Sequence, residues 1–154
     1  MKISALGSSS PAAGGKSPAA TSHSPLKEKP SVLVLSPHEE DHGMLSCVLR
    51  NIAWQVHHSY DLEGAGDCLR EYPISVVLCD CFFQGRSWKD FLEQLSQHPN
   101  SPTLVVASDK ADGRLSAEVL NLGGYDVLAK PFCLPEVIWV VAGAHQQWRS
   151  RATA

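Results

Sequence analysis

Two charged residues, an aspartate and a lysine, each follow an apolar run and could do chemistry together. Asp80 comes after Ser75–Cys79, and Lys130 comes after Tyr125–Ala129. A carboxylate beside an ammonium is either a structural ion pair or a nucleophile with a cation that binds its anionic substrate. The residue types leave both interpretations open, because only the fold can bring two such distant positions together.

Cysteine chemistry is a second candidate. The five cysteines lie inside apolar segments, and their odd number argues against a disulfide framework, so we expect reduced core thiols. Cys79 and Cys81 flank Asp80, and together with the histidines they define an alternative, a small redox or metal catalyst. No C-x-x-C pair accompanies them, and a buried cysteine is more often a small hydrophobic residue.

Several common site motifs are missing. No glycine-rich phosphate loop follows the first apolar run, which argues against dinucleotide and P-loop sites. No strand is followed by the Ser-His-Asp arrangement of the hydrolases either. The chemistry therefore depends on where the apolar runs place Asp80 and Lys130.

Five short apolar runs alternate with five amphipathic segments after residue 30. The spacing predicts strands over 31–36, 54–59, 74–79, 103–107 and 125–129, and helices over 39–51, 62–72, 88–97, 113–122 and 135–148. Strict alternation is typical of an α/β fold with a five-stranded parallel sheet, doubly wound, with helices on both faces. Ligands in such sheets bind outside the carboxyl ends of the strands. We therefore expect Asp80 and Lys130 to meet at that edge, near Ser36, Pro37 and Ser108.

The first 30 residues differ in composition from the rest. Nineteen of them are Ser, Ala, Gly or Pro without periodicity, so we expect a disordered tail over 1–30 and one domain over 31–148. The tail has a net charge of +3 and the body of −6, which disfavours nucleic acid as a partner. No apolar run is long enough to span a membrane and no secretory signal is recognisable, so we expect a cytoplasmic protein.

Two stretches of the chain resemble the CheY-like receiver domains of bacterial response regulators. The more specific is Leu120–Phe132, in which a helix ending in Gly is followed by a short strand and Lys-Pro-Phe. The other is Val76–Asp80, a strand that ends in an aspartate. The resemblance covers residues 31 to about 145 and implies a flavodoxin-like fold. It also implies that Asp80 is the phosphoacceptor, that Lys130 contacts the phosphoryl group, and that the Lys130–Pro131 bond is cis.

The chain departs from the receiver pattern at the site itself. Receivers place two acidic residues that help hold Mg²⁺ after the first strand, where this chain has Ser36 and Pro37. Glu39, Glu40 and Asp41 follow on the first helical turn, as surface acids or as displaced metal ligands. Where receivers have a hydroxyl residue, this chain has Ala107, and Ser108, one place further on, is the candidate to contact the phosphoryl group if the strand end shifts by one residue. Where receivers have an aromatic residue, this chain has Val127, with Tyr125 out of phase.

These departures favour a degenerate receiver, not an enzyme, that needs no cofactor and docks onto protein partners in phosphorelay signalling. The alternative is a working receiver, phosphorylated on Asp80 by a histidine kinase, and only then would it need Mg²⁺. The partner is a histidine kinase or a downstream signalling protein, and homodimerisation through the last helix is a further expectation from the family. The chain ends soon after that helix, so we expect a stand-alone receiver.

Aromatic residues outside the site have structural interpretations. We expect Trp54, Trp88 and Trp139 to pack in the core or at its edge. Phe82 and Phe83 follow Asp80, either as an exposed partner contact or buried over the next helix.

Overall fold

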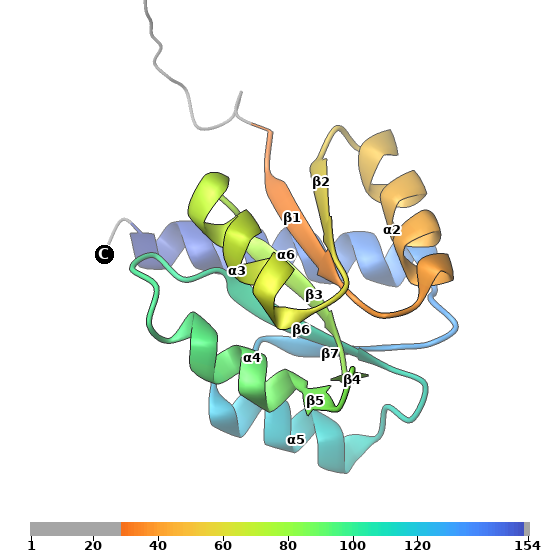
Figure 1. The fold of residues 1–154 in the computed structure, drawn as a ribbon. Helices are drawn as coiled ribbons and strands as arrows, with labels where there is room; N and C mark the ends of the chain where they lie inside the picture. The colour runs from red at the N-terminus through yellow and green to blue at the C-terminus, as the bar shows by residue number, and fades with distance from the viewer. Residues whose placement is uncertain (1–28, 153–154) are drawn as a thin grey trace, which may run out of the picture.

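The computed structural model describes residues 29–152, in which helices lie on both faces of a central sheet (Figure 1). The predicted tail lies outside the described residues except for Lys29 and Pro30. The main strands are β1 (Ser31–Leu35), β2 (Gln55–Ser59), β3 (Val76–Asp80), β6 (Thr103–Ser108) and β7 (Asp126–Ala129). The helices are α2 (Glu39–Asn51), α3 (Leu62–Glu71), α4 (Trp88–Leu95), α5 (Gly113–Leu122) and α6 (Leu134–Ala152).

The five main strands form one parallel sheet in the order β2-β1-β3-β6-β7. The predicted doubly wound sheet is therefore confirmed, and the order reverses direction at β1 and β3, where such folds place their ligands. In the register of β3 and β6, Asp80 lies opposite Ala107. The predicted helices and strands are all present, with ends that differ by a few residues.

A small hairpin was not predicted. Strands β4 (Phe82–Phe83) and β5 (Arg86–Ser87) pair antiparallel directly after Asp80. Their two-residue turn has positive φ at both Gln84 and Gly85, +50° and +77°, as a type I′ turn requires. Two-residue strands are too short to show alternation of apolar and polar residues, so the sequence pattern predicts only a loop here.

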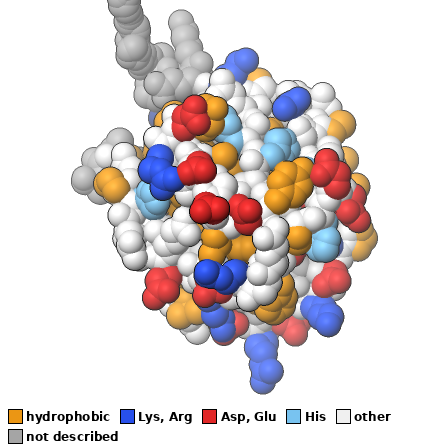
Figure 2. Space-filling view, in the orientation of Figure 1, with side chains coloured by type: hydrophobic (Ala, Val, Ile, Leu, Met, Phe, Trp, Pro, Cys, Tyr) orange, Lys and Arg blue, Asp and Glu red, His pale blue; other side chains and the backbone are white. Residues whose placement is uncertain are grey.

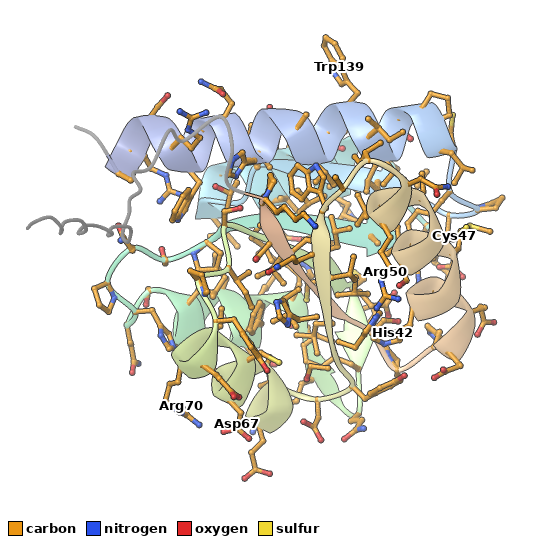
Figure 3. The ribbon with its side chains drawn as sticks, turned by 90° about the horizontal axis from the view of Figure 1, so that it is seen from above. His42, Cys47, Arg50, Asp67, Arg70 and Trp139 are labelled. Carbon is orange, nitrogen blue, oxygen red and sulfur yellow. The ribbon has the colours of Figure 1, made fainter. Side chains whose placement is uncertain are left out.

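Two apolar clusters lie on the two faces of the sheet. One packs α2 and α6 against the strands, and the other packs α3, α4 and α5 against the opposite face (Figure 1). Trp88 is buried and Trp54 partly buried, as predicted, whereas Trp139 is 81% exposed and points away from the body of the molecule (Figure 3). The prediction for Trp139 was wrong, because α6 turns this position away from the sheet.

Local signals set the ends of several helices. Asp61 and Asp112 accept hydrogen bonds from the backbone N–H groups of Gly64 and Leu115, which caps α3 and α5. Ser87 and Asp90 form a capping box at the start of α4. In residues 29–152, no helix is long and apolar enough to cross a bilayer.

Candidate functional site

The carboxyl ends of the strands bring Asp80 and Lys130 together. Asp80 is the last residue of β3, and Lys130 follows β7 and is anchored by a hydrogen bond from its backbone N–H to the carbonyl of Ser108. The Lys130 Nζ lies 2.5 Å from Asp80 Oδ1. Asp80 is buried, and the Lys130–Pro131 bond is cis. Asp80 and Lys130 therefore meet at the predicted edge of the sheet and form an ion pair there.

A second carboxylate enters the site from a helix. Asp41, in the first turn of α2, accepts hydrogen bonds at Oδ2 from Lys130 Nζ at 2.5 Å and from Ser36 Oγ at 2.8 Å. Asp41 is buried, so it is not a surface acid. The Ser36 hydroxyl also accepts a hydrogen bond from the backbone N–H of His38. This bond holds the residues that lead into α2. Lys130 therefore joins two carboxylates from different elements.

The other two acids of this turn lie elsewhere. Glu39 is exposed and accepts a hydrogen bond from the Tyr60 hydroxyl at 2.6 Å. Glu40 is also exposed, and neither carboxylate contacts Asp80. Helical spacing distinguishes Asp41 from Glu39 and Glu40. Asp41 lies four and eight positions before Leu45 and Leu49, on the buried stripe of α2.

The lysine offsets part of the negative charge at the site. Burial alone lowers the pKa of Lys130, but its hydrogen bonds to Asp41 and Asp80 outweigh burial, so its pKa is raised. The ammonium therefore stays charged and offsets one of the two buried carboxylates. His38 brings its Nε2 to 3.8 Å from Asp80 Oδ2, close enough to add positive charge when the ring is protonated.

The residues present do not form the Mg²⁺ site that receivers use. Ser36 and Pro37 stand at the two positions after β1, and the Lys130 ammonium lies between the two carboxylates that do meet. Within residues 29–152, no three His, Cys, Asp or Glu side chains are grouped so that they could hold a metal ion. Mg²⁺ requires close to octahedral oxygen geometry, and here the ammonium stands between the two carboxylates that could contribute oxygens.

The residues expected for a switch are displaced as well. Ala107 lies opposite Asp80, and Ser108 is buried one place further on, where its hydroxyl accepts a hydrogen bond from the Lys110 backbone N–H. Val127 packs in the α3–α5 cluster. Tyr125 packs on the opposite face, where its hydroxyl lies beside Gly143 of α6. Strand β7 therefore has no aromatic side chain that could move together with the Ser108 hydroxyl at the end of β6.

A histidine pair lies behind Ser36 and was not anticipated. His42 Nε2 is 2.9 Å from the Ser36 carbonyl, and His42 Nδ1 is 2.7 Å from His58 Nδ1. Since a carbonyl only accepts, His42 Nε2 carries a proton, and in the neutral pair the His58 Nδ1–H donates to His42. Burial, together with the charges of His42 and Arg50, lowers the pKa of His58. His38 and His42 are one helical turn apart but have different neighbours, because His38 lies near Asp80 and His42 contacts Ser36 and His58.

The thiol alternative finds little support. Cys79 is buried, and burial raises the pKa of its thiol well above the usual value. Burial also raises the pKa of Cys81, so both side chains remain protonated and weakly nucleophilic at neutral pH. Cys47 and Cys133 are exposed, against the expectation of core thiols.

A cavity of about 700 Å³ opens in front of Asp80. The β4–β5 hairpin forms one wall, and the start of α5 forms the other. The sequence left the hairpin phenylalanines as either exposed or buried. Phe83 is buried, and Phe82 is 69% exposed. Asp80 thus faces solvent through this cavity.

The chain is similar in sequence to several curated regulatory proteins. No protein-family model matches the chain. The chain is 31% identical over 110 residues to the "Probable transcriptional regulatory protein TcrX" of Mycobacterium tuberculosis, covering 70% of this chain and 46% of the relative. It is 21% identical over 104 residues to the response regulator GtcR of Aneurinibacillus migulanus, covering 66% of this chain and 42% of the relative. The chain spans about half the length of the curated relatives it matches.

Solved structures show the same fold. A signal receiver domain of an HD domain-containing protein from Pseudomonas fluorescens superposes with a TM-score of 0.72 at 21% identity, covering 80% of this chain and 99% of that domain. The chemotaxis response regulator CheY4 of Vibrio cholerae superposes with a TM-score of 0.69 at 14% identity, covering 76% and 99% of the two chains.

Proposed function

Because residues 29–152 fold as a response-regulator receiver domain, we propose that this domain is a degenerate receiver of two-component signalling. It acts by docking onto protein partners, a histidine kinase or a downstream signalling protein, and has no catalytic turnover and no required cofactor. The observation that carries the proposal is Lys130, held between Asp41 and Asp80 at 2.5 Å from each. The lysine offsets charge where receivers use Mg²⁺.

Phosphoryl transfer to Asp80 would be poorly supported by these residues. The transferred group brings further negative charge beside two carboxylates, and catalysis of such transfers depends on neutralising that charge. Lys130 is the one cation in hydrogen-bond contact with Asp80 in the described part of the chain, and Asp41 already shares it. Ala107 opposite Asp80 offers no hydroxyl to a phosphoryl oxygen.

A working receiver is the second candidate, and Asp41 is the observation that favours it. Asp41 supplies a second carboxylate beside Asp80, and Mg²⁺ is often held by one or two carboxylates plus the phosphate oxygens of the substrate. In that case Lys130 would have to release Asp41 when the ion binds.

Intact-mass measurement distinguishes the two candidates. The full chain is incubated with Mg²⁺ and acetyl phosphate, beside Asp80→Asn, and circular dichroism verifies that both proteins are folded. We expect no phosphoryl adduct on either protein. An adduct on the parent chain that Asp80→Asn lacks would overturn the proposal and establish the working receiver.

A second measurement does not depend on the phosphodonor. Amide NMR spectra are recorded with Mg²⁺ and beryllofluoride, which mimics a phosphoryl group on aspartate. A degenerate site leaves the signals of Asp80, Ser108 and Lys130 unchanged. Shifts that are abolished in Asp80→Asn would contradict the proposal.

A further inference from the structure

The cavity in front of Asp80 holds a set of basic side chains that the receiver site does not use. Arg86 comes from β5, Lys110 from the segment between β6 and α5, and Arg114 from the first turn of α5. All three are exposed, and within residues 29–152 none of their side chains has a carboxylate or carbonyl partner. Three separate elements thus bring unpaired cations to one cavity.

Four acidic residues line the same cavity, and two of them pair with lysines. Asp80 is bound by Lys130, Glu118 is bound by Lys89 at 2.5 Å, and Asp112 caps α5 through the Leu115 N–H. Asp112 has only this backbone partner, and among the described residues no partner is found for the Asp109 side chain. The three unpaired cations, Arg86, Lys110 and Arg114, therefore outnumber the two carboxylates that have no cationic partner, Asp109 and Asp112.

The walls of the cavity are partly apolar. Phe82 projects from the hairpin with 69% of its surface exposed, and Pro37 and Leu115 line the cavity as well. The volume of about 700 Å³ lies within the range of small-molecule sites, which combine apolar walls with a few polar groups. The position also agrees with the general rule for doubly wound sheets, at the carboxyl edge beside the point where strand order reverses.

We propose that this cavity binds a small organic anion, with its phosphate or carboxylate on Arg86, Lys110 and Arg114 and its apolar body against Phe82. A guanidinium group offers two parallel N–H donors, which match the oxygens of a phosphate or a carboxylate. The inference rests on the proposed function, because a site without phosphoryl transfer at Asp80 leaves the cavity to another anion. Such a ligand would stabilise the hairpin against α5 and regulate docking there.

Phenyl phosphate is the probe, and benzyl alcohol and inorganic phosphate are its neutral and its purely anionic controls. Each is titrated at low ionic strength, since salt screens exposed charges, and amide NMR and calorimetry follow binding. Phenyl phosphate is expected to shift the signals of Phe82, Arg86 and Leu115 and to bind at least tenfold more tightly than either control. Equal binding of benzyl alcohol or of inorganic phosphate, or no saturable binding, would overturn the proposal.

Matched variants locate the site. Arg86→Gln combined with Arg114→Gln is expected to weaken phenyl phosphate binding at least tenfold. Arg70→Gln removes an exposed arginine that pairs with Asp67 on α3, outside the cavity (Figure 3), and is expected to leave binding unchanged. If the double variant binds like the parent chain, or Arg70→Gln weakens binding equally, the assigned site is wrong.

One variant separates this proposal from the proposed function. Asp80→Asn removes the phosphoacceptor but none of the three cations, so phenyl phosphate should bind it at least as tightly as the parent chain. Intact mass recorded on the same samples reveals any phosphoryl transfer. Loss of binding in Asp80→Asn would overturn the anion site, whereas an adduct on the parent chain would overturn the degenerate receiver alone.

Discussion

Lys130 is the residue that connects three parts of the candidate site. It follows β7, and it reaches Asp80 at the end of β3 and Asp41 on α2. Because both carboxylates are almost fully buried, their desolvation must be offset by hydrogen bonds and by the ammonium. The raised pKa of Lys130 means that this stabilisation is fully present below its ordinary pKa of 10.5 and is lost as the pH rises through the higher folded value.

Replacement of Asp41 tests this arrangement. Asp41→Asn removes one of the two charges on Lys130, and we expect the free energy of unfolding at pH 7 to fall by about 1–3 kcal/mol. Glu40→Gln is the matched control, because Glu40 is exposed on the same turn, and its effect should stay within about 0.5 kcal/mol. Urea unfolding measures both. Equal effects of the two substitutions would show that Asp41 behaves as an ordinary surface acid.

At the scale of the element, α6 and β7 meet through a tyrosine and a glycine. The Tyr125 hydroxyl lies too close to Gly143 to leave room for a Cβ there, so the glycine lets Tyr125 pack beneath α6, away from the Asp80 cavity. A tyrosine two positions out of phase with the receiver pattern thus has a structural role. The α4 capping box similarly orients the hairpin wall, since Ser87 ends β5 and caps the helix that follows.

Gly143→Ala tests the contact between α6 and β7. The added methyl group would clash with the Tyr125 hydroxyl, and overpacking of this kind destabilises by about 1–3 kcal/mol. Gly43→Ala is the matched control within α2, because an added Cβ there meets nothing within 4 Å, and it should stabilise by about 0.5–1 kcal/mol. Thermal unfolding compares the two variants. If Gly143→Ala unfolds at or above the parent temperature, the Tyr125 packing is looser than described.

For the whole molecule, charge and histidine burial determine the response to pH. Figure 2 shows Lys and Arg side chains scattered among Asp and Glu on the face drawn, without one broad basic area. Burial lowers the pKa values of His57, His58 and His145, which lie on β2 and α6. These histidines bind protons more weakly in the folded state than in the unfolded chain.

The domain is therefore expected to lose stability in mild acid. The contribution of the three histidines is complete above their ordinary pKa of 6.5 and is lost as the pH falls through 6.5 toward the lower folded values. Urea unfolding at pH 7.5 and pH 5.5 measures the loss. His145→Gln removes one of the three and should reduce the difference between the two pH values. Stability equal or greater at pH 5.5 would contradict this expectation.

How far the candidate site could be predicted depends on the residue. Asp80 ends one strand of the parallel sheet and Lys130 follows another, so their place at the same edge could be predicted from the alternation of strands and helices. The spacing of Asp41 to Leu45 and Leu49 places it on the apolar stripe of α2, but its contact with Lys130 could not be predicted, because that contact depends on how α2 packs beside the end of β7. The His42–His58 contact could not be predicted, since it depends on the rotation of α2 against the edge strand β2.

The amino-acid sequence by itself determined the alternating strands and helices, the parallel sheet and the edge at which Asp80 and Lys130 meet. It could do so because apolar periodicity and chain direction are local properties that any packing must satisfy. Only the tertiary structure decided that Asp41 shares Lys130, and that Arg86, Lys110 and Arg114 surround one cavity. Such side-chain neighbours depend on helix rotation and on a short hairpin, which are set by packing between segments far apart in the chain.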